Sequence, residues 1–230
     1  MIGIIVQLAL SWLIVWLFEK GDLRFLGFYP SKKRLQDFVL FFTVTAICCA
    51  AGFFLKMGIA KQQWVINPEL NVPLILKGIW FNIKSVLFEE LIFRGVLLYI
   101  LIKKLGSTKA IIISAAAFGV YHWFSHELFG NIQAMIIEFI ITGAMGLVLA
   151  YAYSKTRSLY IPIAIHLGWG IVQQTVFSDG PIGGQVFIEL MPRLLLTVSY
   201  FSFFVMLLLP ITSALLIDYL ILKKRKQVEL

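Results

Sequence analysis

Residues 38–58 read FVLFFTVTAICCAAGFFLKMG, a run of 21 residues in which Lys56 is the one charged side chain. A helix of about 20 mostly apolar residues is long enough to cross the hydrocarbon core of a bilayer. The other apolar stretches lie at 2–18, 73–102, 110–129, 132–153, 159–177 and 194–222. We therefore expect an all-α, polytopic transmembrane helical bundle of about seven spans, within a range of about six to eight.

The composition favours the same fold class. Hydrophobic residues make up 60% of the 230 residues and charged residues 14%, whereas a typical soluble domain is about 45–50% apolar and about 25% charged. Little chain is left for a soluble domain, so we expect residues 1–230 to form a single integral membrane domain. The net charge of +8 comes from short basic clusters between apolar stretches, which is typical of topology signals and argues against a nucleic-acid partner.

The basic clusters also predict the orientation. They follow the first stretch, the third, the fifth and the last, and short cytoplasmic loops are enriched in Lys and Arg. We expect the N-terminus outside and the C-terminus in the cytoplasm. The first stretch lacks a basic n-region and a small-residue cleavage site, so we expect a retained span and not a cleaved signal peptide.

Details of the apolar stretches give further expectations. Cys48 and Cys49 are neighbours inside an apolar run, which predicts packing residues and not a disulfide or a metal site. The long third and last stretches can tilt, or kink at Pro73 or Pro210. Residues 186–193 are the candidate for an additional element.

Ionisable side chains inside these stretches are the functional candidates, because a charge at the centre of a span costs at least about 2.5–3.5 kcal/mol on insertion scales. The third stretch contains FEELIFRG at 88–95, the fourth FGVYH at 118–122 and the sixth HLGWG at 166–170. With a rise of 1.5 Å per residue, Glu89 (counted back from Lys103), His122 and His166 lie roughly 21, 20 and 14 Å from the basic flank. We expect these three side chains to converge near one level.

The spacing within the third stretch separates two carboxylates. Arg94 lies one turn after Glu90 and can pair with it, whereas Glu89 points about 100° away and can face another helix. We predict that Glu89 and His122 activate a water molecule. His166 then donates to the oxyanion or protonates the leaving amine.

These residues resemble the CAAX protease and bacteriocin-processing family of intramembrane proteases, also called the Abi family. Its first two motifs, E-E-x-x-x-R and F-x-x-x-H, are complete, and they match Glu89, Glu90, Arg94, Phe118 and His122. The likeness covers about residues 77–177, which we expect to be the catalytic core.

The third motif of the family, H-x-x-x-N, is incomplete. His166 is present, but Gly170 stands where the resemblance implies an asparagine that assists the histidine at the oxyanion. Losing one such donor lowers turnover by about 100- to 1000-fold. Gln173 is a candidate replacement, because it lies seven residues after His166 and so on nearly the same face of an α-helix.

Other polar residues leave alternatives open. Glu138 either orients His122 or His166, or pairs with Lys84 or a backbone group. Asn82 and Lys84 either line the cavity expected around the reactive centre or reach the outer interface of the membrane. His126, one turn after His122, is interpreted as an interfacial residue.

The sequence leaves two cofactor hypotheses. We expect a mechanism that requires no cofactor, because Glu89 is available as a base and H-E-x-x-H is absent. The alternative is catalytic zinc held by Glu89, His122 and His166.

The resemblance implies cleavage of peptides or proteins in the membrane, including prenylated CAAX proteins, bacteriocin precursors and signalling peptides. Some members confer immunity to self-made bacteriocins. We expect an integral protein of a bacterial plasma membrane, whose partners are the bilayer and a membrane peptide or protein substrate. Two alternatives remain: a catalytically weak, peptide-binding immunity protein of the same fold, and an ion-coupled transporter that uses the buried charges as a relay.

Overall fold

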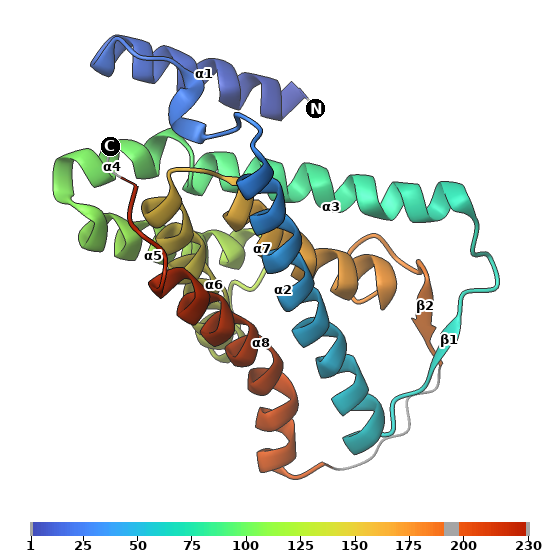
Figure 1. The fold of residues 1–230 in the computed structure, drawn as a ribbon. Coiled ribbons are helices and arrows are strands. Elements are labelled where there is room, and N and C mark those ends of the chain that lie inside the picture. Colours follow the sequence, from blue (N-terminus) through green and yellow to red (C-terminus); the bar gives the residue numbers. More distant parts are fainter. Residues whose placement is uncertain (1, 191–197, 229–230) are drawn as a thin grey trace. The chain divides into compact units, whose positions relative to one another are not determined.

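The computed structural model describes residues 2–190 and 198–228, and it is predominantly helical (Figure 1). In chain order the elements are α1 (Ile2–Glu19), η1 (Leu23–Leu26), α2 (Lys32–Ile59), β1 (Trp64–Ile66), α3 (Val72–Phe93), α4 (Val96–Leu105), α5 (Ser107–Ser125), α6 (Ile132–Thr156), α7 (Tyr160–Gly170), η2 (Ile171–Val176), β2 (Phe187–Glu189) and α8 (Tyr200–Lys223). The element η1 is a 3₁₀ helix and η2 is a π-helical turn. Contacts divide the chain into two compact units, and each is described by itself.

Helices α1, α2, α6 and α8 are the four described helices that are long and apolar enough to cross a membrane. Helix α3 carries four charged side chains, and α7 has only 11 residues. The structure therefore agrees with an all-α membrane protein. The number of spans, the orientation and the single membrane domain remain predictions. The last stretch was expected from residue 194, but α8 begins at Tyr200, and residues 191–197 lie outside the described ones.

The first unit comprises Met1–Phe38, Val86–Ile163 and Tyr219–Leu230. Its helices α5 and α6 pack through small residues, as membrane helices commonly do. A Cβ on Gly146 of α6 would lie 3.0 Å from the Cα of Ala115, and a Cβ on Gly119 of α5 would lie 2.8 Å from the Phe139 ring. This close packing holds α5, the helix that carries the second motif, against α6.

The prediction of one helix over residues 73–102 is wrong. Helix α3 ends at Phe93 and α4 begins at Val96. At the break, a Cβ on Gly95 would lie 2.1 Å from the carbonyl oxygen of Leu91, so this position requires glycine. Pro73 lies in the first turn of α3, where a helix tolerates proline. The depth estimate for Glu89 assumed one straight helix to Lys103, and that premise is also wrong.

The second unit comprises Val39–Ser85 and Ala164–Asp218. An aromatic cluster forms part of its core, with Phe53 and Phe177 stacked at 4.1 Å between ring centroids and Trp64 packed against both. Cys49 is buried in this cluster and is a free thiol, as is Cys48, which confirms that neither forms a disulfide.

Two short antiparallel strands complete this unit, with Val65 of β1 opposite Ile188 of β2. The candidate additional element at 186–193 therefore contains a strand, and its residues 191–193 lie outside the described ones. Pro210 lies inside α8, where its ring would be 2.9 Å from a Cβ on Gly52 of α2.

Candidate active site

The predicted pair of Glu90 and Arg94 is present and completely buried. Arg94 Nη1 lies 3.2 Å from Glu90 Oε1, and both side chains have 0% exposure. The two residues are one turn apart at the end of α3, where a positive charge is also favoured by the helix dipole. A buried charge pair of this kind is strongly unfavourable to break, because either partner alone would be an uncompensated charge.

Phe118 connects the second motif to this pair. The guanidinium carbon of Arg94 lies 4.1 Å from the centroid of the Phe118 ring, within the range of a cation–π contact. Arg94 Nη2 also lies 3.5 Å from the carbonyl oxygen of Gly146 on α6. Arg94 therefore holds together the end of α3, the middle of α5 and α6.

His122 is oriented by its own helix. Its Nδ1 lies 2.8 Å from the carbonyl oxygen of Phe118, and the side chain is buried. Since a carbonyl oxygen can only accept, Nδ1 carries the proton. In the neutral ring Nε2 is then an acceptor, the form that a water-activating histidine needs.

Glu89 is half-buried beside this assembly, on a different face of α3 from Glu90. Its charge acts on His126, which lies in the connection after α5. Glu89 is therefore electrostatically coupled to the α5 end that carries His122. First-motif and second-motif residues are thus brought together within one unit.

Glu138 pairs with His126, a contact that no spacing in the sequence indicates. Its Oε1 lies 3.2 Å from Nδ1 of His126, and the ring centroids of His126 and His122 are 5.3 Å apart. The hydrogen bond to Glu138 raises the pKa of His126 above its usual range, burial opposes the shift, and the charges of Glu138 and Glu89 add to it. Glu138 thus contacts His126, and a role of Glu138 in orienting His122 or His166 remains a prediction.

The third motif lies in the second unit, on α7. His166 is half-buried, and Gly170 follows it one turn later on the same face. A Cβ on Gly170 would lie 2.7 Å from Oδ1 of Asn82 on α3. The place of the missing asparagine side chain is therefore already occupied by the carboxamide of another asparagine.

Asn82 is held firmly in this place, with 2% of its surface exposed. Its Nδ2 donates to the carbonyl oxygen of Gly78 and to Oγ1 of Thr175, both at 3.0 Å. Because both amide hydrogens are used, Asn82 presents an acceptor oxygen to the Gly170 position. Its sequence signal was a polar side chain inside an apolar helix, two turns before Glu89.

The replacement of the missing asparagine by Gln173 remains a prediction. Residues 171–176 form the π-helical turn η2, so the α-helical count from His166 does not apply to Gln173. Its Oε1 accepts a hydrogen bond of 2.8 Å from Nε1 of Trp169. The side-chain oxygen of Gln173 is therefore engaged by Trp169.

Neither unit, over its described residues, contains a group of three His, Cys, Asp or Glu side chains that could hold a metal ion. Within the first unit, Nδ1 of His122 faces a carbonyl and Nδ1 of His126 faces Glu138. The predicted zinc set takes His166 from the other unit, so it remains a prediction, as does the convergence of His166 with Glu89 and His122.

Comparison with known proteins supports the family resemblance. Residues 71–172 match the family described as type II CAAX prenyl endopeptidase Rce1-like, which confirms what the motifs indicate. The chain is also 30% identical over 135 residues to the Bacillus subtilis (strain 168) protein named "Putative membrane peptidase YdiL", over 51% of this chain and 50% of that protein. The chain thus spans about half the length of this curated relative. No solved structure matches the chain significantly.

Proposed function

We propose that the chain is an intramembrane endopeptidase, on the premise that its residues 71–172 match the Rce1-like family of type II CAAX prenyl endopeptidases. It hydrolyses peptide bonds of membrane-associated peptides or proteins with a water molecule activated by Glu89 and His122. The observation that carries this proposal is the assembly of both complete motifs around Arg94. That assembly gives Glu90 a structural partner, and Glu89 is placed on a different face of α3.

In the proposed reaction, the Glu89 carboxylate takes a proton from the water while the water oxygen attacks the peptide carbonyl carbon. Nε2 of His122 accepts the other hydrogen of this water and aligns its lone pair. The carbonyl oxygen becomes an oxyanion. When the C–N bond breaks, Glu89 gives this proton to the leaving amine, so the products are a carboxylic acid and an amine, and the acid then loses its proton to solvent.

His166 is proposed to stabilise the oxyanion by donating from its ring. A ring nitrogen that donates to an anion is best supported when the other nitrogen donates to an acceptor. The Oδ1 of Asn82, at the position next to Gly170, is suited to be that acceptor. Asn82 is therefore proposed as a positioning residue that takes over the role of the absent asparagine.

The proposed substrate is a membrane-associated peptide in a bacterial plasma membrane, in the course of peptide processing or self-immunity. The relative in Bacillus subtilis, with the word peptidase in its name, supports this version. A prenylated CAAX substrate would in addition require a prenylated partner in the same cell. Hydrolysis is proposed to need no metal, since Glu89 serves as the base.

The proposal is tested by peptide mass spectrometry of membranes that contain wild type, Glu89→Gln or, as a matched control, Glu69→Gln. Glu69 is an exposed glutamate in the connection before α3. We expect Glu89→Gln to abolish product peptides, since loss of a general base lowers the rate by about 100- to 10,000-fold. The control and chelator-treated wild type should both remain active.

Two outcomes would contradict the proposal. Identical peptide profiles for all three proteins, with protection from a bacteriocin retained by Glu89→Gln, would favour the peptide-binding immunity protein. Loss of activity on chelation, restored by zinc alone, would show that hydrolysis requires zinc and would contradict the metal-free mechanism.

A further inference from the structure

A cavity of about 210 Å³ lies in the first unit, where several helices begin or end. Its lining includes Lys33 and Arg34 at the start of α2, Arg157 after α6, and Arg225 and Lys226 after α8. Since α2, α6 and α8 are candidate spans, their ends mark the boundary between membrane and water. Water occupies about 30 Å³ per molecule, so the cavity has room for a phosphate group and some water.

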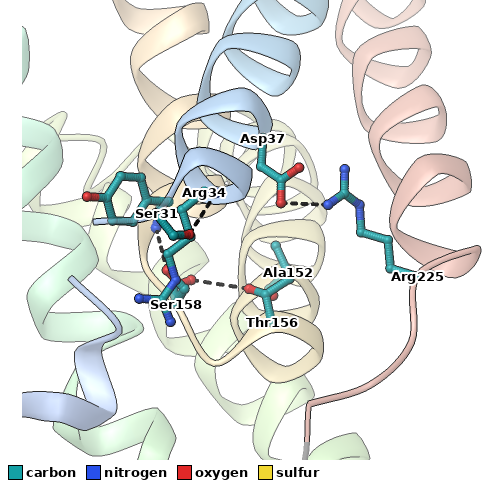
Figure 2. A network of polar contacts seen from close by, with 8 residues as sticks. Ser31, Arg34, Asp37, Ala152, Thr156, Ser158 and Arg225 are labelled. Atoms are coloured by element: carbon teal, nitrogen blue, oxygen red, sulfur yellow. Dashed lines mark hydrogen bonds and ion pairs between the residues drawn. The ribbon is translucent and has the colours of Figure 1, made fainter. Parts of the chain in front are cut away.

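The lining carries a large excess of positive charge. Asp37 is the one carboxylate among the lining residues, and its Oδ2 lies 2.6 Å from Nη1 of Arg225 (Figure 2). Four other basic side chains of the lining have no carboxylate partner among the described residues. They are Lys33, Arg34, Arg157 and Lys226. A hollow lined by one sign of charge concentrates ions of the opposite sign, so the cavity favours an anion.

Arg157 has an unused donor at this cavity. It ends α6 in the left-handed conformation, with a φ of 52°, and its Nε lies 3.4 Å from the carbonyl oxygen of Val228. Its Nη1 is buried and has no hydrogen-bond partner among the residues that the structure describes. Burial also lowers the pKa of Arg157. A buried donor is unfavourable without an acceptor, and a phosphate oxygen would supply a strong one.

The surrounding backbone is held in place by hydrogen bonds. Thr156 Oγ1 donates to the carbonyl oxygen of Ala152 at 2.7 Å, as Figure 2 shows. The C-terminal segment is attached by the N–H of Val228, which donates to the carbonyl oxygen of Lys155 at 3.0 Å. A site whose lining is already ordered loses less conformational entropy on binding.

We propose that this cavity binds a phosphate group, carried by an anionic phospholipid or present as the free ion. Nη1 of Arg157 donates to one phosphate oxygen, and Lys226, Lys33 and Arg34 contribute charge. The location at the ends of candidate spans is where basic pockets meet phospholipid head groups. This proposal does not depend on peptidase activity.

The test measures ligand retention by the purified full chain with native mass spectrometry. The probes are phosphatidylglycerol, phosphatidylcholine and inorganic phosphate, the last at matched ionic strength. The variants are Arg157→Gln and Lys226→Gln, and the control is Lys109→Gln, an exposed lysine outside the cavity. Lys226 is exposed in the C-terminal segment, so its variant remains informative if Arg157→Gln fails to fold.

Wild type should retain phosphatidylglycerol in preference to phosphatidylcholine. Each variant should weaken retention by about 10- to 100-fold, the value of one charge-assisted hydrogen bond. Retention of inorganic phosphate, with the same loss in the variants, would support the free ion as the source. Equal retention of every probe by wild type and both variants, or an equal loss in Lys109→Gln, would overturn the proposal.

Discussion

Arg94 is the residue on which the two complete motifs meet. Its guanidinium pairs with Glu90, stacks on Phe118 and reaches the backbone of α6 at Gly146. The three contacts are with residues of three different helices, so a single side chain fixes how the end of α3 lies against α5 and α6. Such a residue is structural, and the proposed chemistry depends on it through position.

Replacing Arg94 by methionine should destabilise the protein. The substitution leaves the Glu90 carboxylate buried without its cation, which typically costs about 3–5 kcal/mol. The measurement is unfolding of the purified protein in detergent. The matched control is Arg24→Gln, which breaks an exposed pair with Asp22 and should leave stability nearly unchanged, because solvent screens exposed ion pairs. Equal stability of both variants would show that the buried pair is not important.

For individual side chains, the sequence predicted contacts within one helix but did not predict contacts between helices. Glu90 and Arg94 are four residues apart, so helical geometry alone was sufficient to pair them. The stacking of Phe118 on Arg94 and the pairing of Glu138 with His126 depend on how α5 and α6 pack. No spacing in the sequence reports that packing.

Two irregular elements shape the candidate site. Helix α3 ends at Phe93, and Arg94 and Gly95 form the break before α4; the π-helical turn η2 follows the helix that carries His166. Neither was predicted, because both occur inside apolar stretches where hydrophobic periodicity continues across the irregularity. Both irregularities change a count made along a regular helix, that for the depth of Glu89 and that for the helical face of Gln173.

The position of Asn82 leads to an exchange experiment. Asn82→Ala should lower turnover by about 10- to 100-fold, through loss of the acceptor proposed for His166. Gly170→Asn alone should also be impaired, since its Cβ would lie 2.7 Å from Oδ1 of Asn82. The double variant, Asn82→Ala with Gly170→Asn, has space for an asparagine at position 170. It should regain most of the wild-type turnover.

Turnover and thermal stability are both measured for these three variants. Recovery of stability without recovery of turnover in the double variant would mean that Asn82 only fills space. A double variant that is slower than either single variant would contradict the exchange.

For the whole molecule, composition alone indicated the class. Long apolar runs predict membrane helices wherever they occur, and α1, α2, α6 and α8 are the four described helices that meet that expectation. The helices with the motif residues were harder to predict, because α3 carries charge and α7 is short. Ionisable residues within a membrane segment are functional candidates, so the feature that makes α3 hard to predict as a span also marks it for the proposed site.

The proposed chemistry is divided between the two units. The base and the water-orienting histidine lie in the first unit, whereas His166, Asn82 and Gly170 lie in the second. That groups from both units act on one water and one carbonyl remains a prediction.

The most direct test is a double-mutant cycle on turnover of the purified protein in liposomes, with the peptide that membrane profiling identifies as substrate. Wild type, Glu89→Gln, His166→Ala and the double variant are compared. Residues that act as a unit show strongly non-additive losses, so the double variant should be no slower than the worse single variant. Losses that multiply would contradict a single reactive centre.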